Sequence, residues 1–113
     1  MNALRKVWLF SLIAALLLCG CSSEEKKKAK YFEKGKAYYE KGEYDSARIE
    51  LENALKIDPK YQDALLYMGR NAVKLNDPKR AFGSYFNLER LQPDNMEAKT
   101  HLATFFFSGQ KIR

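Results

Sequence analysis

Residues 31–59, YFEKGKAYYEKGEYDSARIELENALKIDP, decide the fold of this chain. Their apolar residues recur at a mostly three-to-four spacing, which is typical of amphipathic helices. Gly42 indicates a turn in the middle, and Asp58-Pro59 ends the pattern because the residue before a proline disfavours helical geometry. Small residues at Gly35 and Ala47 would let two helices approach closely. The stretch therefore predicts two helices joined by a short turn.

The same pattern returns 34 residues later, in residues 65–93, LLYMGRNAVKLNDPKRAFGSYFNLERLQP. The residues that recur are Gly35 as Gly69, Ala47 as Ala81, Asn53 as Asn87 and Pro59 as Pro93. A period of this length is typical of stacked helix pairs. We expect helices near 29–41, 44–57, 62–75, 78–91 and 95–108, and no strand.

Two helix starts carry capping signals. Asn76-Asp77-Pro78 offers an N-cap followed by proline at the first helical position. Asp94 with Glu97 three residues later is a variant of the capping box.

The repeat resembles the tetratricopeptide repeat. The first unit supplies Tyr31, Gly35, Tyr38, Ala47, Leu51, Ala54 and Pro59, and the second Leu65, Gly69, Ala72, Ala81, Tyr85, Leu88 and Pro93. The second departs from the family at Ala72 and Leu88, and Lys99 replaces the first apolar residue of a third unit. The resemblance implies an all-α, tetratricopeptide-type α-solenoid of antiparallel helix pairs. Its repeats would span residues 28–61 and 62–95, with a partial third at 96–113.

In this family the first helix of each pair lines a concave groove that takes peptides or helices. The resemblance places these residues in the groove: Phe32, Lys36, Tyr39, Leu66, Arg70, Val73, Thr100, Thr104 and Phe107. Lys36 and Arg70 hold equivalent positions, so we expect them to lie near each other and to suit an acidic or carboxylate group. The alternative is that both are solvated helix charges. The family's carboxylate-clamp pattern is not matched.

The first residues resemble the signal of a bacterial lipoprotein. Arg5 and Lys6 precede a twelve-residue apolar run, residues 7–18, which is short for a spanning helix of about 20 residues. Leu18-Cys19-Gly20-Cys21 then resembles a lipobox. We expect residues 1–20 to be a signal peptide and residues 21–27 to hold a lipidated Cys21 and a polar tether. An ordinary secretory signal and a retained anchor helix are the alternatives.

This resemblance predicts an exported protein, lipid-anchored to the cell envelope. Because no Asp follows Cys21, the periplasmic face of the outer membrane is expected if the source is Gram-negative. No cysteine follows Cys21, so no thiol is left for a disulfide, a metal or catalysis.

Composition and motifs argue against several functions. The formal net charge is +6, and the charges are mixed in sign along the chain, so nucleic-acid binding is not expected. The dense run of residues 26–30, KKKAK, is either a solvated linker or a contact for anionic lipid headgroups. His101 is the only histidine and fits a surface or packing position. With no metal-ligand spacing and no phosphate loop, we expect no cofactor and no enzyme activity.

The C-terminal end of the pattern predicts an interface. Phe105, Phe106 and Phe107 fall on a terminal helix, and three consecutive aromatics cannot all face one core. We expect either that this chain is part of a longer array, or that this end docks on a partner or self-associates.

These observations together predict a protein–protein interaction scaffold in an envelope assembly or export system, such as pilus, outer-membrane or exopolysaccharide machinery. The alternative is an envelope module that binds peptidoglycan or polysaccharide.

Overall fold

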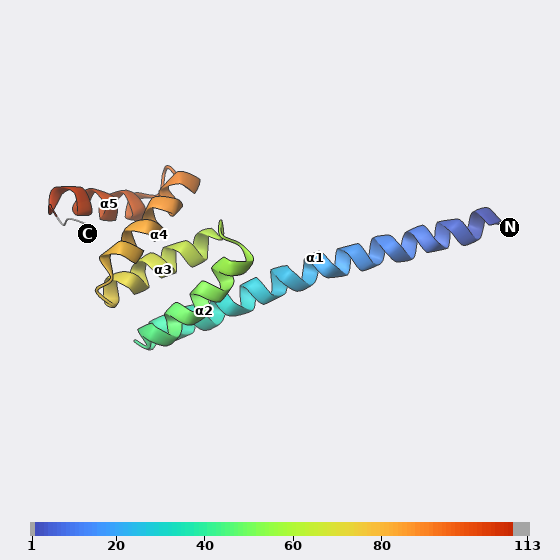
Figure 1. Ribbon diagram of the computed structural model, residues 1–113, viewed down its shortest axis with the longest axis horizontal. Helices are drawn as coiled ribbons and strands as arrows, with labels where there is room; N and C mark the ends of the chain where they lie inside the picture. The colour runs from blue at the N-terminus through green and yellow to red at the C-terminus, as the bar shows by residue number, and fades with distance from the viewer. Residues whose placement is uncertain (1, 110–113) are drawn as a thin grey trace.

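The computed structural model describes residues 2–109, without the side chains of residues 14–22. The side chains of the predicted lipobox, Cys21 included, and the predicted end of the third repeat, residues 110–113, thus lie outside the described part. Five helices occupy the described range: α1 (Asn2–Glu40), α2 (Tyr44–Ile57), α3 (Gln62–Lys74), α4 (Pro78–Leu91) and α5 (Met96–Phe107). α1 runs out of the bundle as a long rod, and the molecule measures 74 × 29 × 23 Å (Figure 1).

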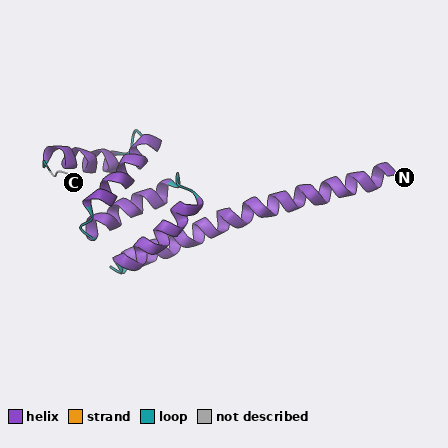
Figure 2. Cartoon of the chain, viewed as in Figure 1, coloured by secondary structure: helices purple, strands orange, loops and turns teal. Residues whose placement is uncertain are grey.

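The helices form antiparallel pairs. α1 packs mainly on α2, and α3 packs mainly on α4 (Figure 1). α2 also contacts α3, and α4 contacts α5, so each pair stacks on the next. Figure 2 shows helices and short loops, with no strand in the described residues. This architecture confirms the predicted all-α, tetratricopeptide-type α-solenoid, and α2 to α5 begin and end within one or two residues of the predicted bounds.

A glycine at the crossing of each helix pair allows the close packing. A Cβ added to Gly35 would lie 2.8 Å from Leu51 Cγ, and one added to Gly69 would lie 2.8 Å from Tyr85 Cζ. Both distances are shorter than van der Waals contact. The large side chain on the second helix of each pair therefore occupies the space that a side chain on the first helix would need.

Two apolar clusters form the core, one at each junction between pairs. The first joins α1, α2 and α3 through Phe32, Leu51, Ala54, Ala64 and Met68. The second joins α3, α4 and α5 through Leu65, Tyr85, Leu88, Ala98 and Leu102. The buried Asn71 adds a polar link between repeats, because its side-chain nitrogen donates to the backbone oxygen of Tyr44 over 2.9 Å.

α1 is longer than the sequence analysis predicted. The expected helix began near residue 29, after a tether, whereas α1 is continuous from Asn2 to Glu40. Residues 2–30 contain no proline and are rich in Ala, Leu, Lys and Glu, which are strong helix formers. An ion pair between Lys28 and Glu25, one turn apart at 3.0 Å, adds support. Among the described residues, no helix combines the length and the apolar character needed to cross a membrane.

One of the two predicted caps is correct and the other is wrong. Asp77 caps α4 by accepting a hydrogen bond from the backbone nitrogen of Arg80, and Pro78 is the first helical residue. For α5 the N-cap is Asn95 rather than Asp94, since Asn95 Oδ1 accepts from the backbone nitrogen of Ala98 over 2.9 Å. Glu97 therefore has no role in a capping box, and its side chain binds elsewhere.

Candidate functional site

Tyr67 of α3 is the centre of the predicted groove. The side-chain nitrogen of Lys36 lies 5.8 Å from the centroid of the Tyr67 ring, and the Arg70 guanidinium carbon lies 5.1 Å from it. The ring of Tyr39 meets the same ring edge-on, with the centroids 5.6 Å apart. α1 and α3 thus bring Lys36, Tyr39 and Arg70 together around one aromatic ring, where cations and π faces attract.

An aromatic row extends from this centre in both directions between α1 and α3. Phe32 lies 5.5 Å from Tyr67 and 5.3 Å from Tyr61 (centroid distances), and Tyr39 lies 5.7 Å from Tyr44. Phe32 is only 7% exposed and belongs to the core. The structure therefore places Phe32 beneath the groove as support for Tyr67, and it offers little surface to a ligand.

Arg70 already has an acidic partner within the chain. Its Nε and a terminal guanidinium nitrogen donate to the two oxygens of Glu97, over 2.8 and 2.7 Å. This bidentate pair links α3 to the first turn of α5. The hydrogen bonds from Arg70 lower the pKa of Glu97, and those to Glu97 raise the pKa of Arg70. Burial raises the pKa of Tyr85, whose hydroxyl lies 3.5 Å from the same carboxylate.

This pair changes the expected chemistry of the groove. The sequence predicted two cations available to an acidic ligand, but a ligand carboxylate at Arg70 must compete with Glu97. Lys36 is half-buried and forms no ion pair with a described acidic side chain. The groove therefore offers one lysine beside aromatic rings rather than a two-cation site.

A cavity of about 370 Å³ lies between α3, α4 and α5. Val73 of α3 and Thr104 of α5, both predicted groove residues, line it together with His101, whose ring stacks on Tyr85 at 4.4 Å between centroids. Leu66 is half-buried, packed against the second core cluster. Thr100 is exposed, and its hydroxyl donates to the backbone oxygen of Met96. Phe107 is 90% exposed at the end of α5 and does not line this cavity.

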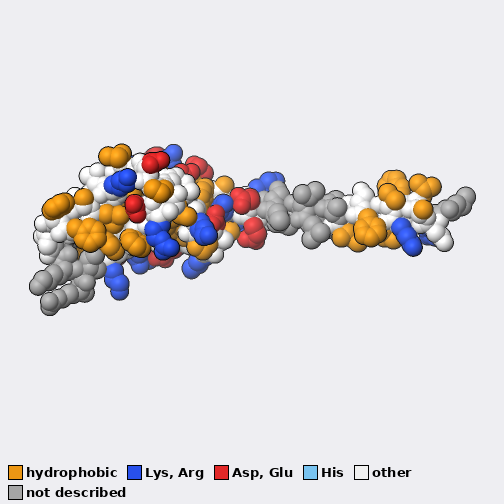
Figure 3. Space-filling model, turned by 90° about the horizontal axis from the view of Figure 1, so that it is seen from above, with side chains coloured by type: hydrophobic (Ala, Val, Ile, Leu, Met, Phe, Trp, Pro, Cys, Tyr) orange, Lys and Arg blue, Asp and Glu red, His pale blue; other side chains and the backbone are white. Residues whose placement is uncertain are grey.

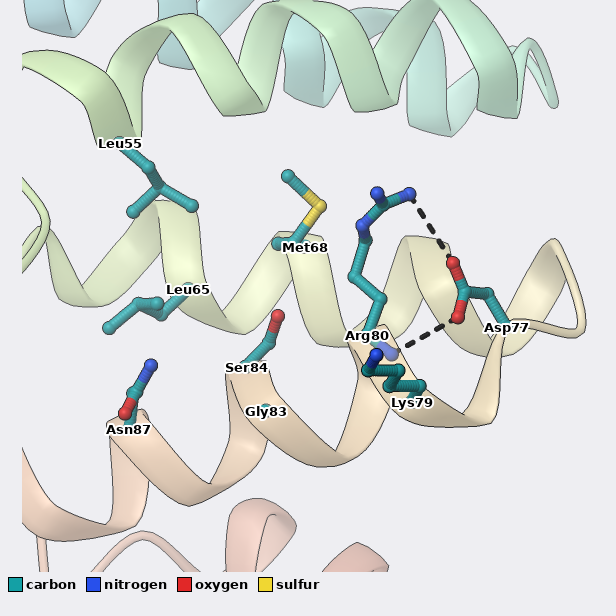
Figure 4. A pocket seen from close by; sticks show the side chains of 9 residues that line it. All are labelled: Leu55, Leu65, Met68, Asp77, Lys79, Arg80, Gly83, Ser84 and Asn87. Carbon is teal, nitrogen blue, oxygen red and sulfur yellow. Dashed lines mark hydrogen bonds and ion pairs between the residues drawn. The ribbon is translucent and has the colours of Figure 1, made fainter. Parts of the chain in front are cut away.

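A second hollow, of about 490 Å³, lies between α2 and α4 (Figure 4). Leu55, Leu65 and Met68 form its apolar side, and polar side chains on or beside α4 form the other. Arg80 pairs with Asp77 at 3.3 Å, as Figure 4 shows, and with Glu52 of α2 at 3.4 Å. The pair with Glu52 joins the second helices of successive repeats, and the two pairs together leave Arg80 less able to bind a ligand.

Tyr67 and Glu97 were not predicted from the sequence as residues of this surface, and His101 was predicted only as a surface or packing residue. Tyr67 and His101 are 34 residues apart, so they hold equivalent positions next to the predicted groove positions. Extending the repeat register by one residue would have found both. No local signal reveals the pairing of Glu97 with Arg70, because the two residues are 27 positions apart.

A comparison with known protein families supports the assignment of the repeat. Residues 35–76 match the family model of the TPR repeat. This part of the chain is therefore similar to the tetratricopeptide repeat. The match begins at Gly35 in α1 and ends in the turn before α4, so it covers the junction between the two helix pairs. No curated protein matches the chain.

Tetratricopeptide repeats typically act as interaction modules that bind other proteins, without catalysis. The geometry fits that role, because the face that carries Tyr67 is built from side chains of two different repeats. Among the side chains of residues 2–13 and 23–109, no group of three or more His, Cys, Asp or Glu is arranged to hold a metal ion.

Proposed function

We propose that this protein is a lipid-anchored tetratricopeptide scaffold that binds other proteins in a cell-envelope assembly or export system. The observation that carries the protein-binding part is the groove around Tyr67, where Lys36, Tyr39 and Arg70 converge from two repeats. A scaffold of this kind needs a partly apolar surface with a few polar anchors, and the half-buried rings of Tyr39 and Tyr67 beside Lys36 supply both.

The chemistry of the groove favours a segment with apolar side chains and one acidic group. Tyr39 and Tyr67 are half-buried, and Val73 is 45% exposed, so they give the partner apolar surface to cover. Lys36 would pair with one partner carboxylate beside the aromatic rings. Because Glu97 neutralises Arg70, a second acidic group on the partner would gain less binding free energy by pairing with Arg70.

The experiment for this surface compares two variants of the full chain. Tyr39→Ala with Val73→Asp alters the groove, and Ile49→Asp alters an exposed position on α2, outside it. We expect proteins that co-purify with the wild-type chain from solubilised membranes to be lost with the groove variant and kept with the α2 variant. Equal recovery with both variants would refute the groove as the binding surface.

The membrane attachment rests on the N-terminal sequence. The basic start, the short apolar run and the lipobox-like residues 18–21 support lipidation of Cys21 and cleavage before it. Lipid chains at that position would hold the protein at the envelope, at the periplasmic face of the outer membrane in a Gram-negative source. We expect wild-type chain to incorporate radioactive palmitate and Cys21→Ala to remain unlabelled and uncleaved. Normal labelling of Cys21→Ala would remove this part of the proposal.

An envelope module for peptidoglycan or polysaccharide is the second candidate, favoured by the row of tyrosines 39, 44 and 67 beside Lys36. Aromatic rings can cover the apolar faces of sugars. This candidate predicts that the chain is retained on purified cell-wall material and that Tyr39→Ala releases it. Absence of retention would leave the protein scaffold as the remaining candidate.

A further inference from the structure

Five lysines form a stripe along one side of α1 and the turn that follows it. The helical pitch places Lys26, Lys27, Lys30, Lys34 and Lys41 within an arc of about 100° around the axis. All five are exposed. Lys41 belongs to the same side because its backbone nitrogen still donates to the Ala37 oxygen, which continues the helical pattern past Glu40. The stripe is about 22 Å long.

The stripe faces away from the helix bundle. Phe32, Gly35 and Tyr39, which contact the rest of the domain, lie on the opposite side of α1. Lys28 lies there as well, where it pairs with Asp58 at 3.0 Å and sits 4.8 Å from the centre of the Tyr61 ring. The four acidic residues of this part of α1, Glu24, Glu25, Glu33 and Glu40, fall outside the lysine arc, the last two along one edge of it.

The lysines of the stripe lack counterions in the described part of the chain. None of the five forms an ion pair there, whereas Lys28, Arg48, Arg70 and Arg80 each do. Like charges one turn apart, such as Lys26, Lys30 and Lys34, destabilise a helix slightly. The electrostatic stabilisation of such a surface is greatest when an extended anionic partner lies along it.

We infer that the lysine stripe binds the anionic headgroups of a lipid surface. Before the proposed cleavage, the same helix carries a run of exposed apolar side chains towards its N-terminus, from Leu4 to Ile13 (Figure 3). After cleavage, the proposed lipid chains on Cys21 would take the place of that apolar segment, five residues before the first lysine of the stripe. An apolar anchor followed by a basic segment is the arrangement that favours a lipid surface over other anionic partners. This inference rests on the membrane attachment proposed above.

Nucleic acid is a poorer occupant of this stripe. Single strands bind where basic residues alternate with aromatic rings on which bases can stack. Of the tyrosines of α1, Tyr39 lies on the opposite side from the stripe, and Tyr31 and Tyr38 border it but are half-buried, Tyr31 against the first core cluster. The stripe itself therefore offers charge with little surface on which bases can stack.

Binding through the stripe fixes how the domain sits on the membrane. Lys26 is five residues from Cys21, which is about 8 Å along a helix, so an anchor at Cys21 would bring the stripe to the headgroups. α1 would then lie along the surface, with α2 to α5 on its far side (Figure 1). The array would be held in one orientation instead of turning freely on a tether.

The test uses vesicles and the chain from residue 23 onwards. This part keeps the whole described core, because every buried side chain among the described residues lies between Phe32 and Leu102. We expect it to co-sediment with vesicles containing about 30% phosphatidylglycerol and not with pure phosphatidylcholine, and to be released above about 0.5 M salt. Since one lysine near an anionic surface strengthens binding about fivefold, replacing all five with Gln should weaken binding at least tenfold.

A matched variant distinguishes the effect of the stripe on vesicle binding from the effect of net charge. It replaces five exposed lysines elsewhere with Gln, namely Lys56, Lys60, Lys74, Lys79 and Lys99. We expect this variant to change binding less than threefold. Equal losses in the two variants, no preference for phosphatidylglycerol, or tighter stripe-dependent binding to a single-stranded oligonucleotide than to vesicles would overturn the inference. Because Cys21 is absent from the protein tested, these outcomes are independent of lipidation.

Discussion

At the scale of single residues, two kinds of contact define this molecule. Gly35 and Gly69 let the helices of each pair cross closely, and the pair of Arg70 with Glu97 ties the second repeat to α5. The repeat register in the sequence predicted the glycines, because they recur at the family's small-residue position. It could not predict the ion pair, which depends on how α5 is placed against α3.

Three glycines give a matched test of the helix crossings. Gly35→Ala and Gly69→Ala should each lower the free energy of unfolding by about 1–2 kcal/mol, since overpacking outweighs the better helix propensity of alanine. Gly83→Ala is the control, because a Cβ there meets no atom within 4 Å. It should raise stability by about 0.5–1 kcal/mol. Chemical denaturation measures all three, and a stabilising effect at Gly35 or Gly69 would show that the crossings are looser than described.

The pair of Arg70 with Glu97 predicts a dependence of stability on pH. Arg70 lowers the pKa of Glu97 in the folded protein below its usual value of 4.5, so the pair stabilises the fold above that pH. The contribution is lost as the pH falls through the lowered pKa. Melting temperatures between pH 7 and pH 3 should therefore fall more for the wild-type chain than for Glu97→Gln. The same fall in both proteins would contradict a role for this carboxylate.

At the scale of elements, the bounds of α2 to α5 agree closely with those predicted from the sequence, and those of α1 do not. The sequence predicted helix ends where a proline or a capping side chain stops the backbone pattern, as at Asp58 and Asp77. For α1 no residue of that kind separates the apolar run from the first repeat, so helix propensity continues through the expected tether. The cap of α5 was misplaced by one residue because Asp94 and Asn95 are both good N-caps.

The cap of α5 can be tested with two neighbouring substitutions. Asn95→Ala removes the acceptor for the backbone nitrogen of Ala98 and should cost about 1 kcal/mol of unfolding free energy. Asp94→Ala should cost less than about 0.5 kcal/mol, because that side chain is exposed and makes no described hydrogen bond. Thermal unfolding of the two variants measures the difference. A larger loss at Asp94 would reassign the cap.

At the scale of the whole molecule, the stacked pairs create surfaces that no single repeat has. Tyr67 contacts Lys36 and Tyr39 of the preceding repeat. The cavity between α3, α4 and α5 is lined by Val73, His101 and Thr104, which also come from different repeats. The family's groove pattern named Lys36, Tyr39, Val73 and Thr104 among these residues, but it did not name Tyr67 or His101. It could not predict that Phe32 is buried beneath them or that Arg70 is neutralised, because both follow from side-chain packing between repeats.

The central claim is that the groove formed by the first helices binds a protein partner, and in-cell photocrosslinking tests it most directly. A photoreactive amino acid is placed at Val73 in the groove, or at Ile49 on α2 as the control; both positions are about half exposed. We predict a discrete crosslinked adduct of defined mass from Val73, lost when Tyr39→Ala is added, and none from Ile49. Adducts of equal yield from both positions, or none from Val73, would contradict the account.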